Sequence, residues 1–376
     1  MRVGLVAMSS PKLGGTYQYT LSMIEALKGL PEVHLTLFVP YGNEAYVDLG
    51  LPLVRLPGFG VAIGQMIRRG LGASGSVDDF SGIDLLVAPI YTTRLLSFGR
   101  PFVYTLHDLQ ERYYPGNFTL AQRLWRAISN QVLTARAAGV ICESEYVRSD
   151  IEKFLKVDRS RIFVIPGPPV SSLTAVDLKT QELAGLKASL SLPDDFVFYP
   201  AQLFPHKNHV RLIRAFARLG SEFRDVHLLF TGDKRYEYQR ILRCAEELGL
   251  SGRVRYLGYI DTQSLAAAYR LARCVAIPTL FESISIPMYE AFSLGVPVCA
   301  SNVFALPEQA GDAALLFDPL SVDDIAEKLA SMLGDDELRG HLVARGRIRI
   351  AAQSMGKYTE QLGCLLSRVA PVRTSS

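Results

Sequence analysis

Cysteine is scarce in this chain of 376 residues, which contains only five. They are an odd number, are widely spaced and lie mostly inside apolar runs, with no C-x-x-C pair among them. This pattern excludes a disulfide framework and the usual spacing of a cysteine zinc site. We therefore expect buried, reduced thiols in a reducing compartment. The five are Cys142, Cys244, Cys274, Cys299 and Cys364.

The chain also lacks a strong charge of either sign. It has 40 Lys and Arg against 37 Asp and Glu, a formal +3 that is too small to indicate nucleic-acid binding. Residues 1–170, with 17 basic and 14 acidic residues, hold the whole excess. No run approaches the ~20 apolar residues of a membrane-spanning helix, and the run at 1–7 is too short for a signal peptide. We predict a cytoplasmic protein.

Short apolar runs bounded by Gly, Pro, Asp or Asn are abundant, with helix-like segments between them. Such runs are typical of parallel strands that helices cover on both faces. We predict twelve strands, six in each half of the chain, and an α/β fold. They are Val3–Met8, Leu35–Val39, Leu85–Ala88, Phe102–Leu106, Val140–Cys142, Ile162–Ile165, Phe196–Tyr199, Val226–Phe230, Val254–Leu257, Val275–Ile277, Val298–Ala300 and Ala314–Phe317.

A proline-rich segment, Pro166-Gly167-Pro168-Pro169, separates the two sets of strands. Proline prevents both strand pairing and helix continuation, so the segment opens the best candidate linker. We predict a first domain at residues 1–170, a linker at 171–194 and a second domain at 195–346. Each domain is expected to be a doubly wound, Rossmann-like sheet that binds ligands at the carboxyl ends of its strands.

Residues 112–136 contain four arginines and no acidic residue. Leu120, Leu124 and Ile128 recur at intervals of four, which predicts an amphipathic helix with a cationic side after Pro115. Two interpretations of this segment stay open. One is a solvated helix face on the first sheet, and the other is a patch that contacts a membrane surface.

The segment 275–297 is the most informative. A predicted strand ends at Ile277, a loop carries Glu282, and Pro287 stands where the first turn of a helix favours proline. The unpaired amides at such a helix start make a site for phosphate. A carboxylate repels phosphate, so Glu282 would serve another part of the ligand, such as sugar hydroxyls. Glu290 lies in an apolar stretch where an unpaired acid is costly, and could accept hydrogen bonds from a ribose.

Glu282 and Glu290 together form an E-x7-E element that resembles the donor-site signature of the retaining glycosyltransferases of family four, also called group-one glycosyltransferases. Other segments resemble the family in the same order: Gly14-Gly15, Thr105–Asp108, Ser144–Ser149, Phe198–Asn208, Leu229–Gly232, Tyr256–Tyr259 and Gly295–Val298. The resemblance implies the GT-B fold, in which two Rossmann-like domains face each other across a cleft. It also implies that the last helix, expected at residues 347–369, packs back on the first domain.

The resemblance further implies transfer of a sugar from a nucleotide-diphosphate donor with retention of configuration. The implied catalytic residues are Glu282 and His107. The implied donor-binding residues are Gly14, Gly15, Gln202, His206, Lys207, Ser283, Ser285 and Glu290. Lys207 and the helix start would supply the positive charge that a departing diphosphate needs. Because the sequence contains no D-x-D, we expect no metal, and no cofactor besides the donor substrate.

Two positions depart from the family pattern. Gln202 stands where the family commonly has an arginine, five residues before Lys207, and Ser283-Ile284-Ser285 replace the glycines that follow the first glutamate. Loss of the guanidinium removes one charge from the phosphate site, which His206 would restore in part if it were protonated. A subgroup that acts on bacterial surface polysaccharides has similar Pro-His-Lys-Asn and Glu-Ser-Ile-Ser-Ile-Pro sequences. We therefore interpret the departures as variation within an active family.

The preferred function is therefore a glycosyltransferase of bacterial surface polysaccharide synthesis that transfers mannose or rhamnose to a glycan or lipid-linked acceptor. Arg112, Arg123 and Arg126 would then attract an anionic acceptor, or anionic lipid on the cytoplasmic face of the inner membrane; nucleic acid is not an expected partner. Two alternatives stay open. One is a nucleotide-sugar epimerase or a phosphorylase on the same fold, and the other is a catalytically dead module that binds sugar nucleotides.

Overall fold

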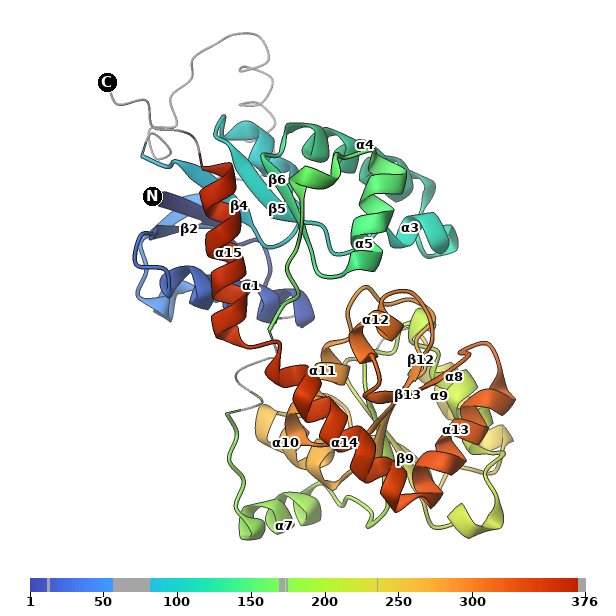
Figure 1. Ribbon diagram of the computed structural model, residues 1–376. Coiled ribbons are helices and arrows are strands. Elements are labelled where there is room, and N and C mark those ends of the chain that lie inside the picture. The colour runs from blue at the N-terminus through green and yellow to red at the C-terminus, as the bar shows by residue number, and fades with distance from the viewer. Residues whose placement is uncertain (12–13, 57–81, 169–172, 174, 235, 371–376) are drawn as a thin grey trace. The chain divides into compact units, whose positions relative to one another are not determined.

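The computed structural model describes residues 1–11, 14–56, 82–168, 173, 175–234 and 236–370. The chain forms two compact units (Figure 1). The first comprises residues 1–168 and the C-terminal segment from Met355, and the second comprises residues 169–354. Each unit contains one parallel sheet between helices, so the predicted α/β class with two doubly wound sheets is confirmed.

The first sheet has seven described strands in the order β3-β2-β1-β4-β5-β6-β7. Side chains of β1 alternate between two core layers, with Val6 on one face and Val3 and Leu5 on the other, as expected for a strand buried on both faces. The strands are β1 Arg2–Val6, β2 His34–Pro40, β3 Leu53–Leu56, β4 Leu85–Ala88, β5 Phe102–Thr105, β6 Gly139–Cys142 and β7 Ile162–Val164.

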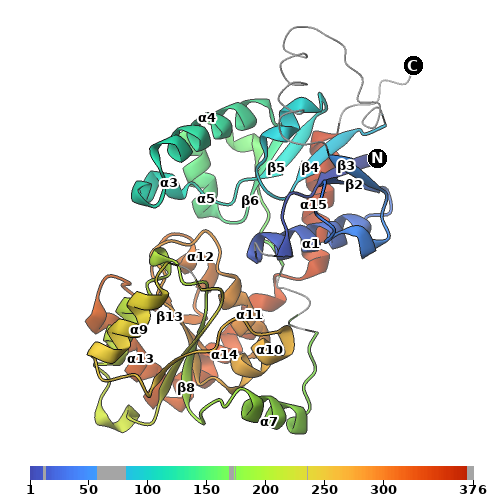
Figure 2. The ribbon, with the colours of Figure 1, turned by 180° about the vertical axis from the view of Figure 1, so that it is seen from behind.

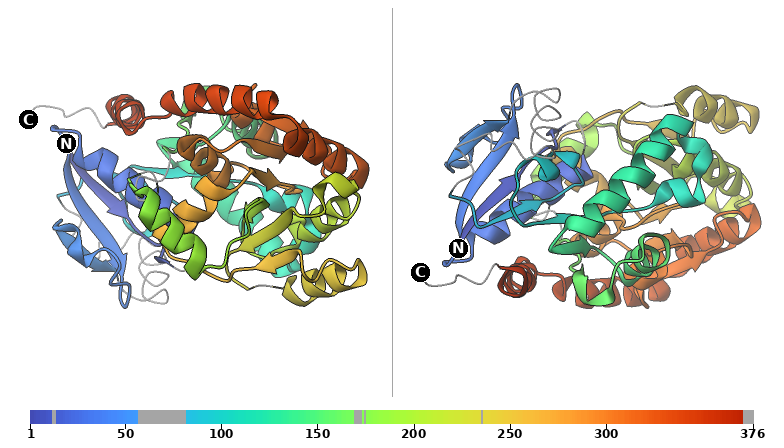
Figure 3. Two further views of the ribbon diagram at one scale, coloured as in Figure 1. Left: turned by 90° about the horizontal axis from the view of Figure 1, so that it is seen from below. Right: turned by 90° about the horizontal axis from the view of Figure 1, so that it is seen from above.

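Helices cover both faces of the first sheet. Helices α1 and α15 pack beside each other on one face, where Met23 and Leu362 join the layer of Leu5 (Figures 1 and 3). Helices α4 and α5 supply Leu133 and Val147 to the other layer, and Figure 2 shows them grouped near β5 and β6. The helices are α1 Gly15–Lys28, α3 Gln110–Tyr113, α4 Leu120–Arg136, α5 Glu145–Asp150 and α15 Met355–Val369, with short turns at Val47–Leu49, Thr93–Ser97, Pro115–Asn117, Ile151–Leu155 and Arg159–Arg161.

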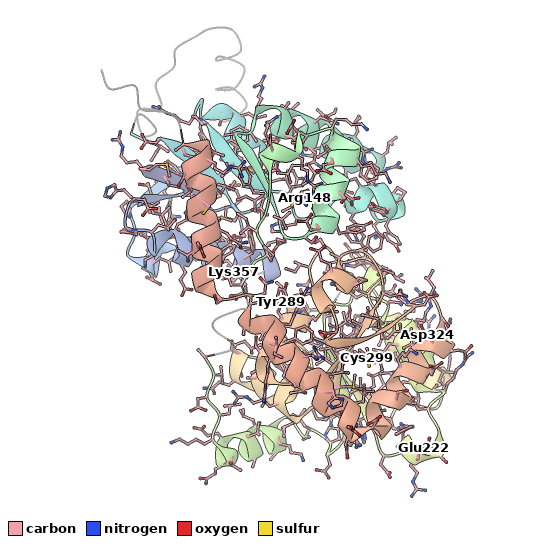
Figure 4. The ribbon with its side chains drawn as sticks, viewed as in Figure 1. Arg148, Glu222, Tyr289, Cys299, Asp324 and Lys357 are labelled. Carbon is pink, nitrogen blue, oxygen red and sulfur yellow. The ribbon has the colours of Figure 1, made fainter. Side chains whose placement is uncertain are left out.

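The second sheet has six described strands in the order β10-β9-β8-β11-β12-β13. Its strands are β8 Phe196–Pro200, β9 His227–Thr231, β10 Val254–Tyr256, β11 Cys274–Ile277, β12 Val298–Ser301 and β13 Ala314–Phe317. Its helices are α7 Thr180–Ser189, α8 His209–Phe216, α9 Tyr238–Glu247, α10 Thr262–Leu271, α11 Ile286–Leu294, α12 Leu306–Ala310, α13 Val322–Gly334 and α14 Asp336–Ala351, with short turns at Pro205–Lys207 and Ser221–Phe223. Cys299 lies inside this unit and Glu222 at its surface (Figure 4).

All twelve predicted strands are present, and two features differ from the prediction. Strand β3 was not predicted, because this edge strand contains Arg55 and is largely half-exposed. The expected single helix at residues 347–369 is instead two helices. Helix α14 ends at Ala351 in the second unit, and α15 begins at Met355 in the first.

Two further expectations concern the burial of the cysteine thiols and the membrane-spanning potential of the helices. Cys142, Cys244, Cys274 and Cys299 are buried and unpaired as predicted, whereas Cys364 is exposed on α15. Within the described residues, no helix is both long enough and apolar enough to span a bilayer.

Candidate active site

The second unit brings Lys207 and Glu282 together at the point where its strand order reverses. Lys207 follows β8 and Glu282 follows β11, and these two strands are neighbours in the sheet although they lie far apart in sequence. The Lys207 ammonium donates a 2.6 Å hydrogen bond to Oε2 of Glu282. Reversal points in doubly wound sheets are where such folds bind ligands, because the flanking loops diverge there. The structure thus places two of the predicted site residues in one ion pair.

Asn208 fixes the position of Lys207. Its backbone is left-handed, with φ of 62°, and its buried side-chain amide donates to the carbonyls of Pro278 and Pro319 at 2.9 Å each. The amide of Leu280 also donates to the carbonyl of His206 at 2.7 Å. The loops after β8 and β11 are therefore tied to each other by a backbone hydrogen bond on one side of Lys207 and by the Asn208 side chain on the other.

His206 does not supply the charge that the sequence suggested. Burial of its ring, with Lys207 alongside, lowers its pKa to about 4, so the side chain is neutral at pH 7. The ring stacks on Phe204 at 5.6 Å between centroids. Gln202 is half-buried on the same loop. The arginine that Gln202 replaces is consequently not compensated by His206, because charging this ring would require its desolvated face to be solvated again.

The loop before α11 is held by Gln309, a residue that sequence patterns did not identify. The Gln309 side chain accepts from the Ser285 amide and donates to the Ser285 carbonyl, both at 2.7 Å. Ser285 is buried, and its hydroxyl has no hydrogen-bond partner among the described residues. Its amide is therefore engaged by Gln309, whereas half-buried Ser283 lies nearer to solvent in the same loop. The reciprocal amide contact gives this serine-containing loop a defined shape.

Glu290 is buried on α11 and pairs with a tyrosine. The Tyr269 hydroxyl, from α10, donates a 2.5 Å hydrogen bond to Oε2 of Glu290. Burial raises the pKa of Glu290 to about 7, although the bond from Tyr269 opposes the shift. The sequence predicted that this carboxylate would need a partner, and the structure identifies Tyr269 as that partner. The hydrogen bond to Oε2 also orients the carboxylate.

The first unit places Gly14 and His107 at the carboxyl ends of β1 and β5. Gly14 precedes α1 with φ of 55° and ψ of −113°, a backbone conformation that favours glycine, and Gly15 is the first residue of the helix. The His107 ring contacts Oε2 of Glu143 through Nδ1 at 2.6 Å and the Pro89 carbonyl through Nε2 at 3.0 Å. Glu143 was not predicted to belong to the site.

The three arginines assigned to an acceptor or a membrane divide into two kinds. Arg112 and Arg123 are exposed. The Arg126 side chain is only 20% exposed and forms ion pairs with Asp108 at 3.0 Å and with Glu111 at 2.8 Å. The charge of Arg126 is balanced inside the unit, which corrects its assignment as an outward-facing cation.

Helix α4 turns its apolar stripe outward. Leu120, Leu124, Trp125 and Ile128 are 76%, 60%, 49% and 53% exposed. The buried side of the helix instead carries Ser129, Asn130, Leu133 and Thr134. An open groove of about 510 Å³ adjoins the stripe and is lined by Tyr91, Thr92, Thr93 and Trp125.

Two family matches together span most of the chain. Residues 187–349 match the family described as Glycosyl transferases group 1, and residues 13–168 match the family described as Glycosyltransferase Family 4. The chain belongs to the group 1 glycosyltransferases of family four. Within the described part of this glycosyltransferase, no three His, Cys, Asp or Glu side chains cluster as metal ligands would, and metal independence stays a prediction.

Curated relatives include two mannosyltransferases of Escherichia coli. O-antigen chain mannosyltransferase B is 29% identical over 294 residues, which are 69% of this chain and 74% of that protein. Serotype-specific mannosyltransferase WbdA is 28% identical over 217 residues, which are 56% of this chain and 27% of WbdA. This glycosyltransferase therefore spans about a quarter of the length of WbdA.

Solved structures share the fold at low sequence identity. HepE of Anabaena in complex with UDP and glucose superposes with a TM-score of 0.76 at 18% identity, covering 98% of this chain and 99% of HepE. WaaG, a glycosyltransferase involved in lipopolysaccharide biosynthesis, superposes with a TM-score of 0.73 at 15% identity, covering 98% of this chain and all of that chain. These likenesses support the GT-B fold.

The residues that sequence reasoning missed are Tyr269, Gln309 and Glu143. Each contacts a predicted site residue or its loop, but each lies in another part of the sequence or carries no motif spacing of its own. Only Glu143 had a usable signal, since it directly follows a buried strand, where polar residues of this glycosyltransferase gather.

Proposed function

We propose that this glycosyltransferase moves a sugar, with mannose and rhamnose as the favoured candidates, from a nucleotide-diphosphate donor to a glycan or lipid-linked acceptor. The transfer retains configuration and needs no metal. The observation that carries the proposal is the pairing of Lys207 with Glu282 at the reversal point of the second sheet, with Glu290 on the helix that follows.

In the proposed donor site Lys207 binds the diphosphate. An ammonium has three N–H donors, so one can remain on Glu282 while the others contact phosphate oxygens. The start of α11 adds the positive end of a helix dipole. Fixed positive charge stabilises the departing diphosphate most strongly when its negative charge has fully developed. Glu282 and Glu290 then accept hydrogen bonds from the transferred sugar and from the ribose.

In the proposed step the bond between the anomeric carbon and the diphosphate oxygen breaks, and that oxygen keeps the electron pair. The acceptor hydroxyl oxygen forms the new bond on the same face of the sugar, which retains the configuration. Its proton passes to the departing phosphate oxygen. No separate general base is required, which is consistent with a site whose nearby histidine, His206, is engaged in stacking.

The names of the relatives support mannose as the first sugar to test. WbdA and O-antigen chain mannosyltransferase B are both mannosyltransferases, and the second name refers to an O-antigen chain. A donor panel tests the proposal: thermal unfolding of the full chain with GDP-, UDP- and dTDP-sugars, followed by product analysis with and without glycan acceptors. One donor should raise Tm and yield product only when acceptor is present. Epimerised donor without acceptor would favour the epimerase alternative.

The variant Glu282→Ala tests whether the proposed site is catalytically active. The variant should lose transfer, and thermal unfolding should show that the unliganded protein still folds. Glu327→Ala is the matched control, since Glu327 is an exposed glutamate of α13. Unchanged transfer in Glu282→Ala would contradict the catalytic assignment, and no Tm shift with any donor would favour a role outside sugar transfer.

The proposal extends to a membrane-bound acceptor through α4. Exposed Arg123 lies on the same helix as the exposed apolar stripe, exposed Arg112 precedes the helix in sequence, and no acidic residue occurs between positions 112 and 136. An interfacial helix binds anionic lipid by combining such an apolar face with cationic flanks. Peripheral contact with an anionic membrane would bring the enzyme to lipid-linked acceptors, whose sugars could enter the groove beside Trp125.

Trp125 makes this contact measurable, because it is the one tryptophan in the chain. Its fluorescence should shift to shorter wavelength with phosphatidylglycerol vesicles and should stay unchanged with phosphatidylcholine vesicles. Leu124→Ser should weaken the binding, and Leu320→Ser, at an exposed leucine of the second unit, should not. An unshifted spectrum with anionic vesicles would contradict membrane contact through α4, while a shift caused by soluble glycan would assign the surface to the acceptor alone.

A further inference from the structure

His107 is enclosed by hydrogen-bond acceptors from the two strands that flank its own. It follows β5, whereas Pro89 directly follows β4 and Glu143 directly follows β6, and the sheet order places β5 between those strands. Nδ1 lies 2.6 Å from Oε2 of Glu143, and Nε2 lies 3.0 Å from the Pro89 carbonyl oxygen. Both ring nitrogens are therefore engaged within the first unit.

The proton count of this arrangement follows from its acceptors. A carbonyl oxygen can only accept, so Nε2 must carry a proton. A bare Nδ1 would then point its lone pair at a carboxylate oxygen 2.6 Å away, and this contact is repulsive unless a proton lies between the two atoms. Histidine is ordinarily more basic than glutamate, so that proton belongs on Nδ1. The ring is then an imidazolium paired with the Glu143 carboxylate.

The groups that pack around His107 and Glu143 also influence whether the His107 ring is charged. Burial of the ring disfavours the imidazolium, but the charge and hydrogen bond of Glu143, with Asp108 beside it, outweigh burial and raise the pKa of His107. The Tyr19 ring meets the imidazole edge-on at 4.9 Å, and Tyr358 of α15 packs against Tyr19. Cys142 lies next to Glu143, and burial raises the pKa of its thiol, so no thiolate competes there.

The Glu143 carboxylate is itself confined. Its side chain is almost fully buried, and a Cβ at Gly167 would come within 3.1 Å of its Oε1 atom. A buried carboxylate without a positive partner is costly, so this carboxylate favours the charged form of the histidine. Both ring nitrogens are engaged by Glu143 and Pro89. Oδ1 of Asp108 accepts from Arg126 and the Gln110 amide, so Asp108 acts on the ring through its charge.

We propose that Glu143 is a positioning residue that fixes the orientation of His107 and keeps it as an imidazolium. This inference rests on the proposed function, and it changes how His107 takes part. With both N–H groups engaged within the first unit, the ring offers positive charge and C–H edges, and it has no free N–H to donate. Removing Glu143 leaves burial as the main influence, and the ring becomes neutral.

Nitrogen-15 NMR of histidine-labelled full-length protein tests the proton count without any substrate. The chain has six histidines, and His107→Gln identifies the signals of His107. In the wild type these signals should keep the pattern of a doubly protonated ring to higher pH than the signals of an ordinary histidine do. In Glu143→Gln the ring should become neutral at lower pH than in the wild type. A wild-type ring that becomes neutral at or below the pH at which an ordinary histidine does would overturn the proposal, even if Glu143→Gln failed to fold.

The matched control is Glu145→Gln, because Glu145 lies two residues away, is half-exposed and pairs with Arg148 on its own helix. It should leave the titration of His107 unchanged. A shift equal to that of Glu143→Gln would overturn the specific role of Glu143. Glu143→Asp, which keeps a carboxylate, should restore part of the imidazolium signal, and no restoration would show that Glu143 acts only by filling space.

The pH profile of transfer links the pair to activity. Glu143→Gln should lower kcat/KM by roughly 10-fold or more at pH 8 and by less at pH 6, where solvent protons can charge the ring. An equal loss at both pH values would indicate a structural role alone. If no variant or wild type transfers sugar, the proposed function fails, while the NMR titration still decides the state of His107.

Discussion

The two units share one order over six strands, to which the first sheet adds β7, but they carry different chemistry at the point where that order reverses. In the second sheet β8 and β11 flank that point and present an ion pair, Lys207 with Glu282. In the first sheet β1 and β4 flank it and present Gly14 and the Pro89 carbonyl, which holds His107. The same topology thus places a charged pair, Lys207 and Glu282, in the second unit and a glycine turn at Gly14 in the first. Topology sets where a site lies, and loop residues set what it binds.

The largest expected effect comes from removing the charge of the second unit. Lys207→Met should lower kcat/KM for the nucleotide sugar by roughly 10²–10³-fold, because one group that stabilises developing charge is lost. Lys187→Met, at a half-exposed lysine of α7 that pairs with Asp194, should leave kcat/KM unchanged. Steady-state kinetics with the preferred donor would check both. Equal activity of the two variants would show that the Lys207 charge does not serve catalysis, and it would contradict the comparison of the two units.

Glu290 should give the second unit a pH dependence of donor binding. Its pKa of about 7 means that the carboxylate becomes a full acceptor for ribose hydroxyls only as pH rises through 7. Nucleoside diphosphate should therefore bind more tightly at pH 8 than at pH 6. Glu290→Gln should weaken binding at pH 8 by roughly 10–100-fold and abolish this dependence. Calorimetric titration at the two pH values would measure it.

The stability of Glu290→Gln should change in the opposite sense. The folded pKa of Glu290 lies above its ordinary value of 4.5, so ionisation opposes folding, and the cost grows between pH 4.5 and 7 and is complete above 7. The unliganded variant should exceed the wild type in free energy of unfolding by roughly 3 kcal/mol at pH 8 and by little at pH 4. A constant difference across this range would contradict the raised pKa.

Gln309→Ala should have a smaller effect, because it acts through the shape of the loop before α11. Loss of its two bonds to Ser285 should raise KM for the donor by roughly 10-fold while changing kcat less. Gln263→Ala, at an exposed position of α10, serves as the control. An unchanged KM would show that the Ser285 loop keeps its shape without Gln309.

The smallest effect separates two arginines of the first unit. Arg123→Gln should weaken binding to anionic vesicles by about 5-fold and leave Tm unchanged, because a surface arginine contributes about 1 kcal/mol there. Arg126→Gln should instead lower Tm, since it leaves the buried Glu111 carboxylate without its ion pair. Vesicle sedimentation and thermal unfolding would distinguish them, and identical behaviour would contradict the division of the arginines.

Much of the fold could be predicted from sequence because buried parallel strands are continuous apolar runs. Strands such as Leu85–Ala88 and Val298–Ser301 are apolar at nearly every position, so their runs are visible without any partner. Strand β3 contains Arg55 and is buried fully only at Leu56, so its pattern resembles a loop. Edge strands give weak signals, because solvent can accept their polar side chains.

The candidate site was predictable only where a motif named its residues. The resemblance to family motifs pointed to Glu282, Glu290, Lys207 and His107. The partners Glu143, Tyr269 and Gln309 do not, since each reaches its contact from a different segment of the chain. Pairs of this kind depend on which strands become neighbours, and no local pattern records that order.

The sequence by itself determined two parallel sheets and the residue types at their carboxyl ends, because apolar runs and breakers act locally. Tertiary structure decided the protonation and exposure of those residues. It left His206 neutral through burial, balanced Arg126 with two carboxylates, and turned the apolar stripe of α4 toward solvent. Burial and pairing energies depend on every element that packs against a side chain, so only the assembled fold could set them.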